Sequence, residues 1–229
     1  MYSRITFANK SRKRALEDRL TDIKIAYTHQ YSVGSAISLT GPAMEPHLFN
    51  YTRLGVNNVF IAENDYKTIH EMRKYQPIVG HVPYKLHQRD VASLFKQLCK
   101  SGECFTDIDL DFTATPTTVL PTVKDILTTM GNYPKSLTFH STLIVTFCQR
   151  NTKRKSAMSG YREILNILNN SESVNVQRVY YQSYKEGAPM ATAMYLLRNI
   201  TTPLLTKPFN GEFENIDSVL ITKGKRQFP

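Results

Sequence analysis

The sequence predicts an α/β fold in which a mostly parallel sheet has helices on both faces and ends in an antiparallel hairpin. Three observations support this prediction. Short apolar runs alternate with helical patterns over residues 35–169, which is typical of β-α units in a parallel sheet. The last two apolar runs have no helical pattern between them, so the strands that they form must pair antiparallel. Hydrophobic residues make up 41% and charged residues 21% of the chain, as in ordinary globular proteins.

The individual elements follow from hydrophobic periodicity and from the residues that start and stop helices. Strands are expected at 35–40, 58–62, 77–82, 104–112, 136–147, 174–184 and 191–198. Helices are expected at 42–54, 65–75, 90–100, 117–130 and 159–169. Gly55 and Gly131 end two of these helices, and Asp65 is a candidate N-cap. The sheet is therefore expected to have seven strands.

A further helix with a basic face is expected at residues 4–24, where Leu16, Leu20 and Ile23 recur at helical spacing. At 229 residues the chain is long enough for one full core. We expect a basic helical extension over 1–32, an α/β domain over 33–200 and a tail over 201–229 packed on or beside the domain. Within the tail, either one more strand near 218–222 or irregular chain is expected.

Charge and composition limit the possible partners. Lys and Arg total 29 against 19 Asp and Glu, which gives a formal charge of +10. This excess favours an anionic partner, with nucleic acid first and an anionic membrane surface second; the alternative is a basic protein without such a partner. No apolar run approaches the roughly 18–20 residues that span a bilayer, so no membrane partner is expected. Three cysteines and no signal-like N-terminus favour reduced thiols in the cytoplasm. The scattered histidines predict no metal site.

The loop after the first strand is the first candidate for a ligand site, because ligands of a doubly wound sheet bind at the carboxyl ends of its strands. It contains Thr40, Gly41, Pro42 and Ala43. Gly41 permits a positive φ and a close approach to the backbone, and Pro42 suits the first turn of a helix. An ordinary strand-to-helix turn is the other interpretation. The loop lacks the G-x-G-x-x-G of a dinucleotide site, and the chain has no P-loop motif, so a nucleoside cofactor without phosphates fits better.

Glu63 and Asn64 follow the second strand, and Glu63 lies 22 residues after Gly41. An acid about 20 residues after such a loop commonly holds ribose hydroxyls, since carboxylate oxygens accept from both hydroxyls. The alternative is that Glu63 or Asp65 only caps the next helix. Both interpretations hold together if Asp65 caps and Glu63 binds.

Asp107, Asp109 and Asp111 alternate along the fourth strand, so they share one face of it. Three carboxylates on a buried face repel one another and are costly to desolvate. At least one must therefore reach the strand end, a cation or a hydrogen-bond donor. A cationic ligand, a metal and an amino group that must be oriented all remain open, as does an exposed strand with solvated acids.

Four cations follow the fifth strand, near the edge where a ligand is expected: Arg150, Lys153, Arg154 and Lys155. Such a loop at the rim of a cleft suits phosphate groups, and a solvated loop is the alternative. The aromatic residues that could interleave with this charge are Tyr161, Tyr180, Tyr181 and Tyr184. Tyr180 and Tyr181 point to opposite faces of their strand, so at most one reaches the cleft side.

Over residues 33–200 these motifs resemble those of class I S-adenosylmethionine-dependent methyltransferases. ISLTGPAMEP (37–46) resembles a divergent first motif, and NVFIAEN (58–64) resembles the second, whose acid holds the ribose. IDLDFTATP (108–116) resembles the fourth motif and is closest to the IDLDPFG type of tRNA guanosine dimethyltransferases. SLTFHSTLIVTFCQR (136–150) is similar to the fifth strand of the family. The first motif lacks its second glycine, a divergence that occurs in virus-encoded members and in members without activity.

The resemblance implies a Rossmann-like methyltransferase fold with S-adenosylmethionine as cofactor and RNA or DNA as substrate. It places the cofactor against Thr40, Gly41, Pro42, Ala43, Glu63, Asn64 and His81. It implies that Asp109 and Asp111 accept hydrogen bonds from the N–H of the acceptor base. Phe112 then stacks on a base, unless it belongs to the core. The alternative is a fold that has lost catalysis and binds nucleic acid or an assembly partner.

Overall fold

The structure, a computed structural model, describes residues 11–28, 33–42, 44–74, 81–149, 154–186, 188–200 and 211–216. Its strands are β1 (Ser35–Ser38), β2 (Val59–Glu63), β3 (Tyr84–Gln88), β4 (Phe105–Asp111), β5 (Leu137–Cys148), β6 (Val174–Glu186), β7 (Ala188–Asn199) and β8 (Glu214–Asn215). Its helices are α2 (Ser11–Thr28), α3 (Glu45–Leu54), α4 (Tyr66–Arg73), α5 (Val91–Lys100), α6 (Pro116–Asn132) and α7 (Arg154–Asn169), with a 3₁₀ turn η1 (Pro134–Ser136).

One sheet holds all eight strands in the order β3-β2-β1-β4-β5-β7-β6-β8. The first five strands in this order are parallel, and β7 pairs antiparallel with both β5 and β6. The predicted α/β fold with its antiparallel hairpin is confirmed. The predicted number of seven strands is wrong, because the short β8 adds a parallel eighth strand beside β6. The tail strand expected near 218–222 lies outside the described residues.

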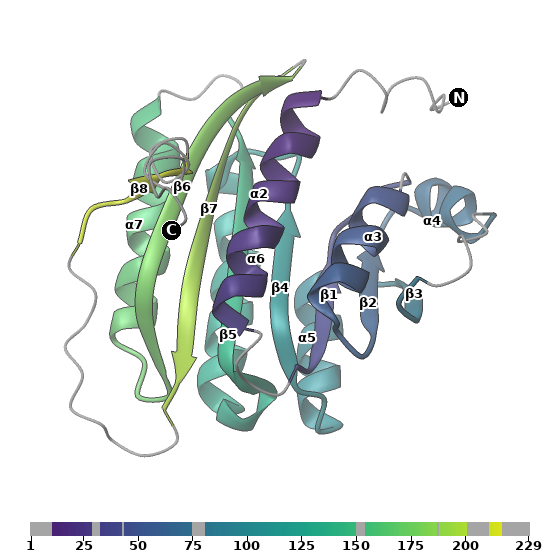
Figure 1. Ribbon diagram of the computed structural model, residues 1–229, viewed down its shortest axis with the longest axis horizontal. Helices are drawn as coiled ribbons and strands as arrows, with labels where there is room; N and C mark the ends of the chain where they lie inside the picture. The colour runs from purple at the N-terminus through teal and green to yellow at the C-terminus, as the bar shows by residue number, and fades with distance from the viewer. Residues whose placement is uncertain are drawn as a thin grey trace, which may run out of the picture.

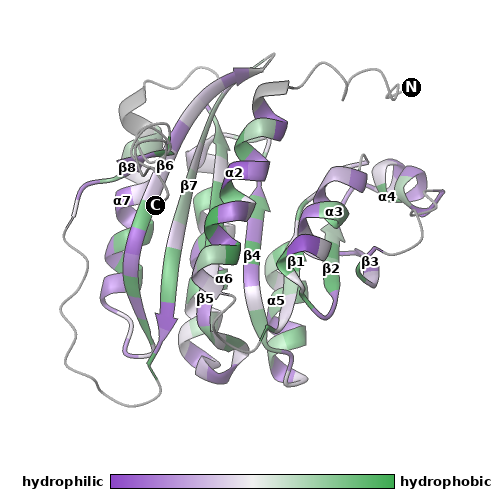
Figure 2. Cartoon of the chain, in the orientation of Figure 1, coloured by the Kyte–Doolittle hydropathy of each residue, from purple (hydrophilic) through white to green (hydrophobic). Residues whose placement is uncertain are grey.

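Helices cover both faces of the sheet (Figure 1). α2 and α3 lie in front of it in this view, and α5, α6 and α7 lie behind. The rear face buries the larger core, to which Ile37, Ile108 and Leu143 contribute from three adjacent strands. The front face has two smaller cores, one under α3 and one under α2. Hydrophilic bands along β4, in the middle of the sheet, separate these two front cores (Figure 2).

The third strand was predicted at 77–82, but β3 begins at Tyr84. Residues 75–80 lie outside the described part, and residues 81–83 precede the strand. β3 is an edge strand, so it alternates polar and apolar residues and lacks the continuous apolar run of a buried strand. The apolar run before it therefore gave a misleading signal.

Two predicted helix ends are confirmed, whereas the one at Gly131 is wrong, because α6 continues to Asn132. Asp65 caps α4 by accepting the N–H of Thr68 at 2.7 Å, and Gly55 ends α3 with a φ of 74°. Cys99, Cys104 and Cys148 are all free thiols. Of the helices that the structure describes, none is both long and apolar enough to cross a membrane.

Candidate functional site

The carboxyl ends of the parallel strands bring several predicted residues to one edge of the sheet. The register pairs Ser38 of β1 with Ile61 of β2 and with Asp109 of β4. Thr40, Glu63 and Asp111 each lie two positions after one of these paired residues. Because parallel strands advance together, these three residues lie level with one another at the same edge. We call this the carboxyl edge.

The turn after β1 leaves its backbone open to a ligand. Gly41 has a φ of 65°, and a Cβ placed there would have no heavy atom within 4 Å. Thr40 is buried and Pro42 is half-buried beside it, whereas Ala43 lies outside the described residues. A positive φ at this point requires glycine or a strained residue. The turn therefore has the free backbone that the sequence predicted for a ligand loop.

Glu63 combines two features expected of a ribose-binding acid: a place at the end of β2 and an oxygen that remains available. The side chain is half-buried, and its Oε1 accepts the N–H of Asp65 at 2.7 Å. The other carboxylate oxygen has no hydrogen bond to any residue that the structure describes. Its neighbour Asn64 is exposed. The helix cap is supplied by Asp65, whose pKa is lowered by the N–H of Thr68, so Glu63 is not needed as a cap.

Lysines from α2 meet the three aspartates of β4. Lys24 Nζ lies 2.6 Å from Asp107 Oδ2 and 3.7 Å from Asp109 Oδ2. Asp107 is fully buried and also accepts the hydroxyl of Thr142. Lys13 Nζ lies 2.5 Å from Asp111 Oδ2. The partners of these aspartates are therefore lysines of the same chain. Within the described ranges no cluster of His, Cys, Asp and Glu could hold a metal.

Lys13 and Lys24 are spaced along α2 by nearly the same distance as Asp111 and Asp107 along β4. They are 11 residues apart, which is about three helical turns and roughly 16 Å, so both point the same way. Asp107 and Asp111 are four residues apart, or roughly 13 Å along the strand. α2 begins at the end toward which the β4 arrow points (Figure 1), which brings Lys13 to the carboxyl edge and Lys24 to the middle of the sheet.

The ion pairs decide the charge of these groups. Burial alone would lower the pKa of Lys24 and of Lys13, but the adjacent carboxylates of Asp107 and Asp111 outweigh burial and raise both pKa values. Both lysines are therefore fully charged. Burial raises the pKa of Asp109 to about 7, and the more distant Lys24 offsets this only in part.

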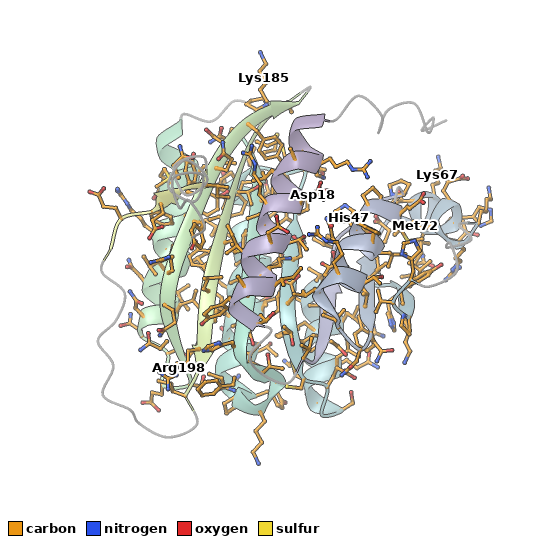
Figure 3. All side chains as sticks on the ribbon, viewed as in Figure 1. Asp18, His47, Lys67, Met72, Lys185 and Arg198 are labelled. Atoms are coloured by element: carbon orange, nitrogen blue, oxygen red, sulfur yellow. The ribbon has the colours of Figure 1, made fainter. Side chains whose placement is uncertain are left out.

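A small polar cavity of about 30 Å³ lies between α2, α3 and β4, with room for about two water molecules. The polar residues of its lining are Glu17, Thr21, Lys24, His47, Asn50, Tyr51 and Asp109. His47 comes from α3 on the side of α2 (Figure 3), and its Nε2 lies 3.7 Å from Glu17 Oε1. Neither atom has a hydrogen-bond partner in the described parts of the chain, and the same is true of the Tyr51 hydroxyl. The cavity is far too small for a nucleoside, so it is not the cofactor site.

A second cavity of about 20 Å³ adjoins the carboxyl edge beside Asp111. Lys13 of α2, Thr146 of β5, Tyr184 of β6 and Thr192 of β7 line it with Asp111. The hydroxyls of Thr146 and Thr192 lie 2.8 Å apart. Burial, reinforced by the charge of Asp111, raises the pKa of Tyr184, so its hydroxyl stays protonated. Asp111 therefore lies among hydrogen-bond donors contributed by four other elements.

Several predicted site residues lie elsewhere. Phe112 packs half-buried against the rear core, on the opposite face from the aspartates. His81 precedes β3, at the amino end of that strand, and is therefore at the opposite edge of the sheet from Gly41 and Glu63. Of the predicted nucleic-acid-binding residues, two lie outside the described residues and two are the first of α7, with undescribed side chains: Arg150, Lys153, Arg154 and Lys155.

The tyrosines expected to form an aromatic surface are mostly core residues. Tyr161, Tyr180 and Tyr181 are 0%, 4% and 7% exposed. Tyr180 and Tyr181 do point to opposite faces, but each face is covered, by α2 in front and by α7 behind. Tyr161 donates its hydroxyl to the Ala191 carbonyl oxygen at 2.5 Å. Only Tyr184 lies near the carboxyl edge.

A periodic pattern in α2 indicates the partners of the aspartates, which the sequence analysis missed. Lys13, Glu17, Leu20 and Lys24 follow one another at helical spacing, so they form a single stripe along α2. A stripe with two cations is complementary to a strand with three acids on one face. His47 and Tyr51 are likewise one turn apart on α3. These residues complete the surroundings of Asp109 and Asp111.

Comparison with known proteins establishes the fold. No family model and no curated protein matches the sequence. A SAM-dependent methyltransferase from Leishmania major superposes with a TM-score of 0.53 at 15% identity, covering 84% of this chain and 75% of that one. A SAM-dependent methyltransferase from Agrobacterium tumefaciens gives 0.53 at 11% identity, covering 80% and 61%. The methyltransferase domain of bacterial CtHen1-C gives 0.50 at 8% identity, covering 79% and 97%. At these identities the likeness concerns architecture, and this chain has the Rossmann-like fold of SAM-dependent methyltransferases.

Proposed function

We propose that this protein is an S-adenosylmethionine-dependent methyltransferase that acts on nucleic acid, RNA or DNA. One observation carries the proposal: Glu63 ends β2 level with the open Gly41 turn that follows β1, in a fold shared with such enzymes. The free thiols of all three cysteines suit a reducing compartment such as the cytoplasm.

The residues at the carboxyl edge fit a nucleoside cofactor. Glu63 has one carboxylate oxygen available to accept from ribose hydroxyls, and the backbone of Gly41, next to Thr40, is open to close approach. Pro42 and Asn64 flank these two positions. When bound there, the cofactor supplies an electrophilic methyl group. The glycine-poor turn has no phosphate-binding arrangement, which agrees with a cofactor that has no phosphates.

Asp111 is the proposed acceptor-side residue. Lys13 occupies its Oδ2, so the other oxygen can accept a hydrogen bond from the N–H of an acceptor base. This bond orients the nitrogen and stabilises positive charge that develops on it. Lys13 bonds to Asp111, and Tyr184 lines the second cavity together with both residues. Asp109 lies two residues before Asp111 on the same strand, further from the carboxyl edge, and its nearest cation is Lys24 at 3.7 Å.

Nucleic acid is the proposed substrate because of charge. The chain has a formal charge of +10, and four of its cations lie at 150–155, directly after β5 in the sequence. Phosphate groups are the ligands that such a surface favours.

One observation favours a second candidate, a fold without catalysis that binds nucleic acid or an assembly partner. Both carboxylates that would act at β4 are close to lysines of α2, at 2.5 Å for Asp111 and 3.7 Å for Asp109. Ion pairs of this kind also occur with a purely structural purpose.

A transfer assay decides between the two candidates. The wild-type protein, Asp111→Ala and the control Asp125→Ala, an exposed acid on α6, are incubated with methyl-labelled S-adenosylmethionine and pools of RNA or single-stranded DNA. We expect transfer by the wild type and the control, and a loss of roughly 100-fold or more for Asp111→Ala with cofactor affinity almost unchanged. Full turnover by Asp111→Ala would remove it from the site. Cofactor binding without transfer to either pool would support the second candidate.

A further inference from the structure

The segment around the edge strand β3 has a marked excess of positive charge. Residues 66–100, which form α4, β3 and α5, contain seven Lys and Arg against two acids. This segment of 35 residues therefore has a formal charge of +5, half of the +10 of the whole chain. We call its seven cations the basic edge: Lys67, Arg73, Lys74, Lys85, Arg89, Lys96 and Lys100.

The cations of the basic edge are exposed and largely without acidic partners. All seven side chains are exposed. In the part of the chain that the structure describes, Lys74 is the one that forms an ion pair, with Glu71 at 2.8 Å. The other acid of the segment, Asp90, is engaged in capping α5, where it accepts the N–H of Ser93 at 2.8 Å. Surface charges of one sign repel one another when acids are not interspersed, and a bound polyanion relieves this repulsion.

The basic edge adjoins the proposed cofactor site. Glu63 pairs in register with Gln88 of β3, and the N–H of Arg89 donates to the Glu63 carbonyl oxygen at 3.1 Å. From there the cations follow β3 and α5 toward the opposite edge of the sheet. α5 has ten residues, so it extends for about 15 Å. Lys67 lies at the outer end of the molecule, on α4 (Figure 3).

We propose that the basic edge binds the phosphate backbone of a single-stranded nucleic acid. Its residues differ from the cations at 150–155, which follow β5 in the sequence. The choice of nucleic acid among polyanions rests on the proposed function. Tyr66 favours a single strand: it is 63% exposed at the start of α4 and stacks on His70 with ring centroids 6.3 Å apart. An exposed aromatic ring beside cations offers a stacking surface for an unpaired base.

Salt-dependent binding of a fluorescein-labelled 20-nucleotide single-stranded RNA tests the proposal, with fluorescence anisotropy as the readout. The variant is Lys85→Gln/Lys96→Gln/Lys100→Gln. The matched control is Lys124→Gln/Lys135→Gln/Arg162→Gln, which removes three exposed cations from α6, η1 and α7. Each lost phosphate contact reduces the slope of log K against log salt by about 0.7, so the variant should lose about 2 from the slope and at least tenfold in affinity at 0.1 M salt. The control should keep the wild-type slope, and both variants the wild-type melting temperature.

Equal slopes for the variant and the control would overturn the proposal, as would a wild-type protein that does not bind the RNA. Binding to phosphatidylserine vesicles that depends on the basic edge, without RNA binding, would assign the surface to membranes instead. A duplex of the same sequence that binds more tightly would contradict the single-stranded form. Titration of the same variants with S-adenosylmethionine separates the two proposals. If the protein binds S-adenosylmethionine but the variant and the control have equal salt slopes, only the basic-edge proposal is wrong. If the variant has the reduced slope but the protein does not bind S-adenosylmethionine, only the methyltransferase proposal is wrong.

Discussion

Asp109 is the acid of β4 for which the chain provides the least compensation. Asp107 and Asp111 each have a lysine within hydrogen-bond distance, but the nearest ammonium to Asp109 is at 3.7 Å and is shared with Asp107. Glu17 of α2 and Tyr51 of α3 also face it. Burial lowers the pKa of His47, so that ring adds no positive charge at neutral pH. Four carboxylates thus share two ammonium groups, and Asp109 takes up a proton with a pKa of about 7.

The raised pKa of Asp109 makes the free energy of unfolding depend on pH. Between about pH 4 and 7 the folded protein keeps a proton that the unfolded chain has released, so stability falls as pH rises through this window. Asp109→Asn removes this dependence. We expect the variant to be more stable than the wild type by roughly 2 kcal/mol at pH 8 and by about nothing at pH 4. This gain in stability is smaller than the full pKa shift of Asp109 implies, since the Asp109 side chain is still 19% exposed. Urea unfolding at both pH values measures it.

Asp125→Asn, on the exposed surface of α6, is the matched control and should show the same pH dependence as the wild type. If Asp109→Asn were less stable than the wild type at pH 8, Asp109 would be an ionised partner of Lys24, and its pKa would not be raised.

The sequence predicted that the aspartates need a cation or a donor, and it could not identify that partner. Lys24 and Lys13 are 83 and 98 residues away from their aspartates. Helical spacing shows which residues share a face of α2, but the strand beneath that face depends on how the whole chain packs. Gly41 and Glu63 were predictable because each follows directly from a local motif at a strand end.

α2 is fixed to the sheet by charge as well as by apolar contacts. Leu16 and Leu20 join the front core with Ile144 and Met194, and Lys24 beside them is 5% exposed. Burying an ion pair costs desolvation on both groups, so its presence adds little net stability by itself. Removing one partner is different, because the other charge is left buried and unpaired.

Lys24→Met should therefore destabilise the fold by about 3–5 kcal/mol, because Asp107 stays buried without its cation. Lys24→Met/Asp107→Asn should recover at least about 1–2 kcal/mol of this loss, which a double-mutant cycle in urea measures. The control Arg14→Met changes an exposed cation on the same helix and should stay within about 0.5 kcal/mol of the wild type. An equal cost for Lys24→Met and Arg14→Met would show that α2 does not depend on this pair.

At the scale of elements, the buried strands were predictable within a few residues and the edge strands were not. β5 contains an apolar run, and β4 places buried apolar residues between its aspartates, because both faces of these strands are covered. β3 is half-exposed and β8 has two residues, so neither produces a strong hydrophobic pattern. The positions of β3 and β8 are set by pairing with β2 and β6, so the residues of β3 and β8 alone do not predict them.

Across the whole molecule, the same edge of the sheet collects the open turn of Gly41, the half-buried acid Glu63 and the Lys13–Asp111 pair. The basic edge reaches this site from β3, where Arg89 donates its backbone N–H to Glu63. The arrangement suits an enzyme that holds a nucleoside cofactor at the centre and a polyanion across its surface. Binding of the cofactor by Glu63 is the central claim, since the other roles depend on it.

Calorimetric titration with S-adenosylmethionine, S-adenosylhomocysteine and NAD tests this claim most directly, on the wild type, Glu63→Ala and Asp65→Ala. We predict binding of the first two ligands alone, with a Kd on the order of 1–10 μM. Glu63→Ala should weaken binding at least about tenfold through the lost hydrogen bonds to the ribose, and Asp65→Ala should weaken it less. Failure of the wild type to bind either ligand, or equal losses in the two variants, would contradict the account.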